Sequence, residues 1–161
     1  MIAVLLAGTG CAHYRLGTGS TLPFSSIYLE PVANHTLAPQ SQAIVSARLR
    51  EAFLRDARVQ VTNSAAGADA TLALAITGYR RDIATVREDD TGLARKFNVT
   101  LTVTGTLRDN RAGKIIWEKR TVTATREVFT DSGQLQSEYQ IVPLLAETLA
   151  PRILHLVLDQ W

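Results

Sequence analysis

The sequence predicts an α+β fold: a two-layer sandwich in which two amphipathic helices pack on one face of a mostly antiparallel, four- to five-stranded sheet. Two observations predict this class. Residues 97–107 alternate apolar and polar side chains, as a strand with one buried face does. Residues 40–57 and the last quarter of the chain instead repeat apolar side chains with the period of a core-facing helix.

The bulk composition is typical of a single globular domain. The 161 residues suffice for one hydrophobic core, and 46% hydrophobic with 20% charged residues is ordinary for such a domain. Seventeen Lys and Arg against fifteen Asp and Glu residues give a net charge of +2, which is not typical of a dedicated nucleic-acid binder. We therefore expect no nucleic-acid partner, and any electrostatic partner must be bound by a local patch.

The single cysteine, Cys11, follows an apolar run, residues 1–10, that ends in small residues. This pattern indicates an export signal, and a Cys directly after small residues is where bacterial lipoproteins are cleaved and acylated. The run lacks a basic start and has Gly8 where the usual lipobox has Leu, so a buried strand ending in an unmodified Cys is the alternative. We expect a signal-peptide remnant at 1–10, a lipidated tether at 11–23 and a single domain at 24–161.

The first half of the domain is predicted to contain a strand, a helix and a short strand. Residues 24–32 alternate until a proline ends the strand, and residues 33–39 form a loop whose last proline can open a helix. Residues 40–57 carry one apolar stripe. A short strand at 58–62 precedes a turn at 63–67.

Three longer strands are predicted next, at residues 70–81, 97–107 and 114–126. A long polar hairpin tip at 82–96 separates the first two, and the turn at 109–113 separates the second and third. The alternation is clearest at 97–107, where the threonines lie on the face opposite the large apolar side chains.

The chain is predicted to end in a helix. Ser137 and Gln140 match a capping box, which places Pro143 in the first turn, while Pro151 lies inside the pattern and should kink the helix. The apolar stripe of this helix consists of Val142, Leu145, Leu149, Ile153 and Leu156.

No catalytic motif is recognisable in the sequence: the nucleophile elbow, the zinc-protease helix and the dinucleotide-binding glycine loop are all missing. The histidines are scattered, with His13 in the tether, His35 in a loop and His155 in the last helix. One Cys and three scattered His residues make a poor metal site. We therefore expect no enzymatic activity, no metal and no cofactor.

Basic side chains gather around the two predicted hairpins. Arginine forks and lysine ammonium groups on the polar edge of the sheet can bind phosphates or carboxylates of a lipid headgroup. The alternative is a solvated surface that keeps the protein soluble. The candidate binding residues are Arg80, Arg95, Lys96, Arg108, Arg111, Lys114, Lys119 and Arg120.

Several short segments of the chain together carry a family resemblance. They are residues 11–14 (CAHY) with Leu16 and Gly17, 26–36 (SIYLEPVANHT), 68–72 (ADATL) with Ile76 and Tyr79, and 113–118 (GKIIWE). Each segment is weakly specific alone, but in their order and spacing, through nearly the whole mature chain, they resemble the LptE family, the lipoproteins of the lipopolysaccharide-assembly translocon.

The resemblance implies a two-layer α/β sandwich held on the periplasmic side of the outer membrane by outer-membrane lipid on Cys11. It implies two further partners: the LptD-type outer-membrane β-barrel, whose lumen such a lipoprotein plugs, and lipopolysaccharide, which it binds and helps to deliver. Ala12 after the cysteine fits outer-membrane sorting. The resemblance assigns no lipopolysaccharide contacts, so the eight basic residues rest on charge and strand placement alone.

Two other functions remain open on the sequence. One is a periplasmic lipoprotein interaction module that regulates a cell-wall synthase or a secretion assembly, because residues 24–34 followed by an amphipathic helix fit such folds too. The other is an enzyme whose site is built from unremarkable residues, which a cleft with a buried carboxylate or His pair would indicate.

Overall fold

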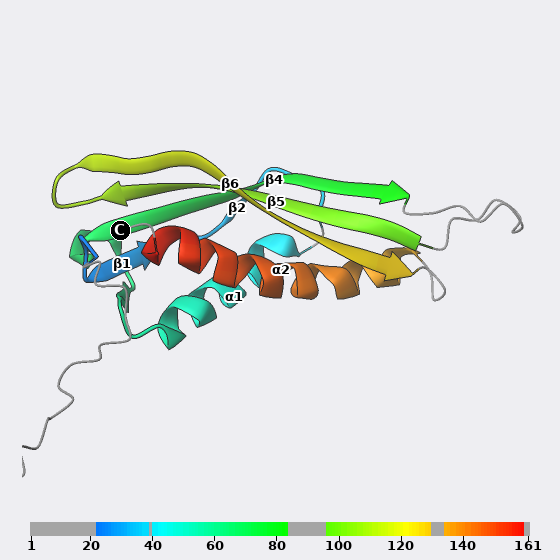
Figure 1. Ribbon diagram of the computed structural model, residues 1–161, viewed down its shortest axis with the longest axis horizontal. Helices are drawn as coiled ribbons and strands as arrows, with labels where there is room; N and C mark the ends of the chain where they lie inside the picture. The colour runs from blue at the N-terminus through cyan, green and yellow to red at the C-terminus, as the bar shows by residue number, and fades with distance from the viewer. Residues whose placement is uncertain (1–21, 39, 84–95, 130–133, 160–161) are drawn as a thin grey trace, which may run out of the picture.

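Two helices lie on one face of a single sheet in the computed structural model of the chain (Figure 1). The structure describes residues 22–38, 40–83, 96–129 and 134–159. The predicted α+β class with two helices on one sheet face is confirmed. Cys11 and the rest of the predicted tether up to residue 21 lie outside the described residues.

The sheet is built around three long antiparallel strands, β4 (Ala70–Ile83), β5 (Lys96–Asp109) and β6 (Lys114–Phe129). The three predicted strands are confirmed, and each runs slightly beyond its predicted bounds. Ile83 pairs with Phe97, so both ends of the expected hairpin tip belong to strands, and residues 84–95 of that tip lie outside the described residues.

The other three strands are short and make the sheet mixed, with six strands instead of four to five. They are β1 (Ser26–Leu29), β2 (Ala33–Asn34) and β3 (Gln60–Thr62). The order is β3-β1-β4-β5-β6, and β2 pairs with β4 beyond the end of β1. All pairings of β1 and β2 are parallel, so the sheet is mixed, although its three long strands are antiparallel as predicted.

The parallel pairing follows from the helix between the short strands. Helix α1 (Ser41–Arg55) crosses over from β2 to β3 and returns the chain in its original direction, as a parallel neighbour requires. Pro31 ends β1 as predicted, but the chain then pairs again as β2. The predicted apolar stripe of α1 is confirmed, since Val45, Leu49 and Phe53 are all buried.

Helix α2 (Gln134–Leu158) begins before the predicted capping box, so Ser137 lies inside the helix and that prediction is wrong. Pro143 and Pro151 are both interior. Each interior proline costs about 3 kcal/mol. The helix tolerates both because it buries a long stripe, each large member of which contributes about 1.5–3 kcal/mol. The stripe consists of Ile141, Val142, Leu145, Leu149, Ile153, Val157 and Leu158.

The apolar character of α2 also has a simple structural reason. Residues Tyr139–Leu158 are long and apolar enough to cross a membrane by length and composition alone, with a mean hydropathy of 1.6. Half of this segment is buried inside the domain, where it packs on the sheet and on α1. The predicted stripe holds except at Leu156, which is half-buried while its neighbour Val157 is fully buried.

A tight contact inside the core involves Gly105 of β5. A Cβ atom at this position would lie 2.6 Å from Leu74 Cδ2 and 3.4 Å from the ring of Trp117. The missing side chain therefore lets the leucine and the indole occupy the space over β5. A β-bulge in β6 follows this contact, with Lys119 in the left-handed region at φ 54°.

Candidate functional site

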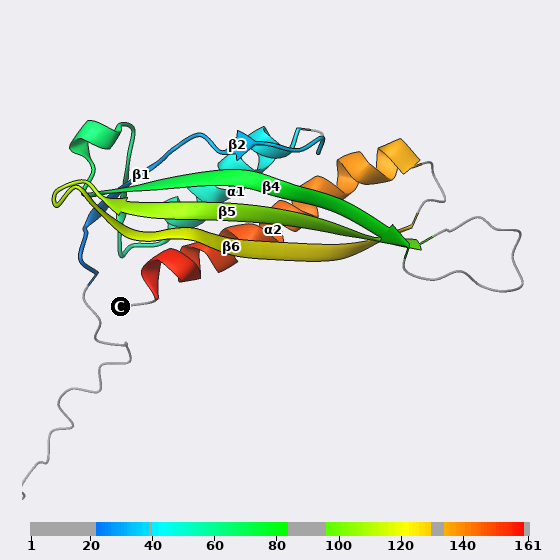
Figure 2. The same ribbon diagram turned by 90° about the horizontal axis from the view of Figure 1, so that it is seen from above.

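The helices leave the other face of the sheet open (Figure 2), and the strands β4, β5 and β6 present threonine side chains on it. Thr77 and Thr104 share a hydrogen bond of 3.0 Å, and Thr100 and Thr125 share one of 2.9 Å across the next pair of strands. The predicted alternation of β5 is confirmed, since Val99, Leu101 and Val103 are buried beneath the helices while the intervening threonines are not. The open face is therefore polar but largely uncharged at its centre.

The structure separates the predicted basic residues into two groups at opposite ends of the sheet. Arg80 and Lys96 lie near the end where β4 and β5 meet residues 84–95, and Arg95 lies outside the described residues. The other five lie around the β5–β6 hairpin. Arg80 pairs with Thr100, so Arg108 is roughly 27 Å further along β5 at about 3.4 Å per residue. One headgroup cannot contact both groups.

The first group is paired with carboxylates. Arg80 Nε donates to Asp82 at 2.8 Å, and Lys96 Nζ lies 2.7 Å from a Glu127 oxygen. The Arg80 side chain is 74% exposed. Exposed pairs of this kind contribute little to stability, roughly 0–1 kcal/mol, so the two cations can exchange their partners for another anion.

Arg111 in the second group is held by Asp69. Its Nε donates to the carboxylate at 2.6 Å, and its Nη2 pairs with the other carboxylate oxygen. The same carboxylate accepts the backbone N–H groups of Ser25 and Ser26 and the Ser25 hydroxyl. Arg111 and these donors hold the pKa of Asp69 well below its usual range. Arg111 thus ties the start of β1 to the β5–β6 hairpin.

The other cationic side chains of the second group have no carboxylate partner among the described residues. Arg108, Lys114 and Lys119 are exposed and form no ion pair there. The Arg120 guanidinium lies over the Trp117 ring, 5.4 Å from its centroid. These side chains therefore form the part of the predicted site that is free to bind an anion.

This second group lies at the end of the sheet where β1 begins. Ile27 pairs with Ala70, and Ala70 pairs with Asp109, the last residue of β5. The chain thus enters the domain beside the β5–β6 hairpin, far from the end of β4 at Ile83 (Figure 1).

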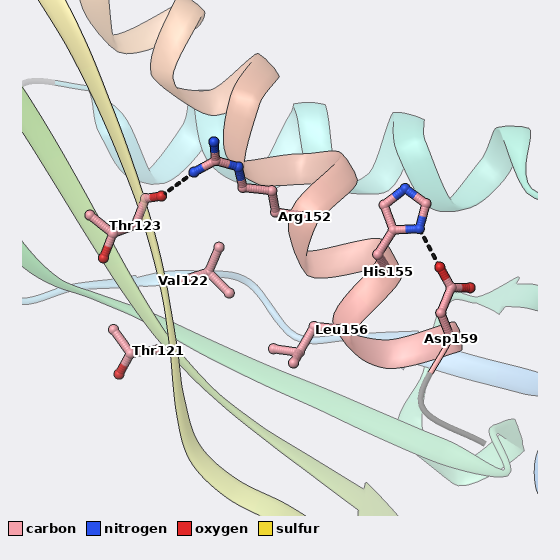
Figure 3. Close-up of a pocket in the computed structure, with 7 residues that line it drawn as sticks. All are labelled: Thr121, Val122, Thr123, Arg152, His155, Leu156 and Asp159. Carbon is pink, nitrogen blue, oxygen red and sulfur yellow. Dashed lines mark hydrogen bonds and ion pairs between the residues drawn. The ribbon is translucent and has the colours of Figure 1, made fainter.

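A shallow groove of about 520 Å³ lies between the edge strand β6 and helix α2 (Figure 3). The Arg152 guanidinium spans it, and its Nη1 donates to the Thr123 carbonyl at 2.6 Å. Nearby on β6, Arg126 Nη2 donates to the Thr148 hydroxyl at 3.1 Å. Neither arginine was predicted as a site residue, because only the packing of α2 on β6 brings the two together.

Metal-ligating side chains do not cluster among the described residues. No three His, Cys, Asp or Glu side chains among them approach closely enough to hold a metal ion. His35 lies in the loop after β2, and His155 on α2 forms an exposed pair with Asp159. The groove is lined by Thr121, Val122, Thr123, Arg152, His155, Leu156 and Asp159.

Comparison with known proteins agrees with this geometry. A family model described as "LptE: Lipopolysaccharide-assembly" matches residues 24–156. Three solved structures are similar in fold. A minor lipoprotein from Acinetobacter baumannii is 21% identical with a TM-score of 0.57, covering 86% of this chain and 97% of that one. An uncharacterised lipoprotein B from Nitrosomonas europaea is 18% identical with a TM-score of 0.58, covering 85% of each chain.

The third is a protein from Xanthomonas campestris, 10% identical with a TM-score of 0.64 over 86% of each chain. None of the curated proteins compared with the chain matches it. At these identities the structures establish the shared fold, and the family match carries the assignment.

Proposed function

This chain belongs to the LptE family of lipopolysaccharide-assembly proteins, and we propose that it acts as an outer-membrane lipoprotein, the plug and scaffold of an LptD-type β-barrel. In this role it binds its partners and catalyses no reaction. The observation that carries the proposal is the two-faced sheet, with helices over one face and threonine hydroxyls over the other.

The open sheet face supports contact with a barrel lumen. The interior of an outer-membrane barrel is polar, whereas its lipid-facing exterior is apolar. The threonine hydroxyls can both donate and accept hydrogen bonds, so they can match a wall of mixed polar side chains without burying an unpaired charge. A sheet with an apolar open face would instead favour an apolar partner, either lipid or protein.

The entry point of the chain supports anchoring at one end of the sheet. A lipid on Cys11 would hold the end that carries the β5–β6 hairpin, because β1 begins there. Each buried acyl methylene contributes about 0.8 kcal/mol, so several acyl chains give lasting attachment. In this orientation, Lys114 and Lys119 lie on the membrane-proximal part of the domain.

The cations without carboxylate partners support lipopolysaccharide binding at that same end. Phosphate oxygens are strong acceptors for guanidinium and ammonium donors. Arg108, Lys114 and Lys119 are the described members of the second group that have neither an ion pair nor an aromatic contact. Arg111 contributes indirectly, because it keeps the hairpin attached to β1.

The proposal is tested by depleting the protein in its own cells and measuring lipopolysaccharide at the cell surface. We expect surface lipopolysaccharide to fall, and native protein extracted from outer membranes to co-purify with a large β-barrel. Normal surface lipopolysaccharide after depletion would contradict the proposal. Recovery with a peptidoglycan synthase in place of a barrel would support a cell-wall regulator instead.

A further inference from the structure

Strand β6 is the last strand of the sheet, and its outer edge has no neighbouring strand among the described residues. It is also long, running from Lys114 to Phe129. An exposed edge of this length presents unpaired backbone N–H and C=O groups, which can pair with another extended chain. The bulge at Lys119 interrupts the edge near the β5–β6 hairpin, but the ladder is regular from Arg120 onward.

The hydrogen bond of Arg152 identifies which backbone groups point outward. The Thr123 carbonyl accepts from Arg152 on α2, so it faces away from β5. Alternate residues of an antiparallel strand direct their backbone N–H and C=O groups to the same edge. The backbone groups of residues 121, 125 and 127 therefore also point away from β5. The 2.9 Å contact between the Thr125 and Thr100 hydroxyls agrees, because side chains approach most closely at pairs that exchange no backbone hydrogen bonds.

Three arginines follow this edge, and their partners among the described residues carry no charge. Arg120 lies over the Trp117 ring, Arg126 donates to the Thr148 hydroxyl, and Arg152 donates to a backbone carbonyl. Two acidic side chains along this edge and groove are engaged elsewhere: Asp159 pairs with Arg58 and His155, and Glu127 pairs with Lys96. The edge therefore combines unpaired backbone groups with three arginines that have no carboxylate partner among the described residues.

We propose that β6 binds an extended acidic segment of a partner protein as an added strand, with carboxylates on alternate residues of that segment contacting Arg120, Arg126 and Arg152. This inference goes beyond the proposed role in lipopolysaccharide assembly and does not depend on it. Strand addition supplies affinity through backbone hydrogen bonds, while side chains on alternate residues supply selectivity.

Arg152 has a specific part in this exchange. In the free protein its guanidinium satisfies the Thr123 carbonyl. An incoming strand offers a backbone N–H to that carbonyl, which stays paired, and a carboxylate to the guanidinium, which gains a charged acceptor. Arg120 and Arg126 are six residues apart, roughly 20 Å along the strand, and Arg152 reaches β6 between them (Figure 3).

A peptide fits the edge better than an isolated anion does. Separate phosphates can accept from the guanidinium groups, but they do not offer donors at the spacing of the outward carbonyls of β6. An extended peptide offers both donors and acceptors at the spacing of a strand. Binding of phosphate groups to the arginines is therefore the competing outcome that the experiment must separate.

The experiment titrates the full domain with a capped octapeptide in which glutamate alternates with valine. Backbone amide shifts of residues 121, 123, 125 and 127 are followed by NMR. Two N-methylated versions serve as matched probes, one methylated at every glutamate and the other at every valine. Because alternate N–H groups of a strand point to one edge, we expect one version to lose binding and the other to retain it.

Protein variants test the arginines. Replacing Arg126→Gln and Arg152→Gln together should weaken binding of the peptide about tenfold or more, as loss of close charge contacts at an interface does. The control, Arg50→Gln with Arg55→Gln on α1, removes the same charge and should leave binding unchanged. Equal binding of both N-methylated peptides, or shifts confined to arginine side chains, would overturn strand addition and indicate simple anion binding.

Discussion

Gly105 is a position at which one added carbon atom would disturb the core. Its Cα faces Leu74 and the Trp117 ring, and a Cβ would approach the leucine methyl to 2.6 Å. We expect Gly105→Ala to lower the free energy of unfolding by roughly 1–3 kcal/mol, the usual cost of overpacking. Urea denaturation measures the change.

Gly67 provides the control for this substitution. A Cβ there would meet only the Ser64 hydroxyl, at 4.0 Å. Gly67→Ala should therefore change stability by no more than about 0.5 kcal/mol, as surface substitutions usually do. Equal effects of the two substitutions would mean that the crowding around Gly105 is not the cause.

Asp69 predicts a pH dependence of stability. Its pKa in the folded protein lies well below the ordinary value, because Arg111 and the Ser25 and Ser26 donors bind the charged carboxylate. The unfolded chain therefore binds its proton at higher pH than the folded protein does. The stabilisation is complete above the unfolded pKa of about 3.9 and is lost as the pH falls through the folded pKa.

The measurement compares wild type with Asp69→Asn across pH. We expect the variant to be less stable at pH 7 and the difference to shrink as the pH falls below about 4. Asp82→Asn, which removes a half-exposed carboxylate with Arg80 as its partner, should have a small effect at pH 7. A difference for Asp69→Asn that stays constant down to strongly acid pH would contradict this account.

Helix α2 stabilises the domain through the one face that is buried. Leu149 is fully buried, while Leu144 on the same helix is 44% exposed. We expect Leu149→Ala to cost about 2–5 kcal/mol of unfolding free energy, because it leaves a cavity. Leu144→Ala, the same chemical change, should cost less than about 1 kcal/mol, and chemical denaturation of both variants tests the difference.

Local periodicity predicted the elements that have a strong pattern of their own. The long strands and both helices follow from alternation or from an apolar stripe, and the stripe of α1 at Val45, Leu49 and Phe53 is buried as predicted. β2 could not be predicted in this way, because Ala33 and Asn34 carry no pattern and are strand residues only through pairing with β4. The start of α2 at Gln134 was also not predicted, because the capping signal at Ser137 lies three residues further along the chain.

The candidate site was predicted only in part for a related reason. Charge counting identifies the cations, but the separation of Arg80 from Arg108 depends on the direction of β4 and β5. The pairing of Arg111 with Asp69 joins residues 42 positions apart in the chain. Arg126 and Arg152 were missed because helix-to-strand packing leaves no local trace in the sequence.

At the scale of the whole molecule, the two basic groups lie at opposite ends of the sheet, so they can be tested separately. We expect Lys114→Ala with Lys119→Ala to weaken lipopolysaccharide binding about three- to tenfold, because each exposed charge contact contributes roughly 0.2–1 kcal/mol. Thermal stability should stay nearly unchanged, because both side chains are exposed and lack ion pairs among the described residues. Calorimetric titration measures the affinity.

Arg50→Ala with Arg55→Ala removes the same charge from α1 and controls for long-range electrostatics. Both control arginines contact neighbours on or near α1, at Asn63 and Glu51. Equal weakening by the two double variants would assign the effect to net charge. Unaltered binding by Lys114→Ala with Lys119→Ala would remove the hairpin from the lipopolysaccharide site.

The placement of β1 between β3 and β4 has a mechanical consequence. Tension transmitted along the axis of β1 from its first residues would load the hydrogen bonds on both sides of the strand together, in shear, instead of opening them one after another. The Asp69 carboxylate accepts hydrogen bonds from the backbone N–H groups of Ser25 and Ser26, so these bonds would bear the load first. A domain anchored through the residues that precede β1 would therefore resist mechanical unfolding at its anchored end.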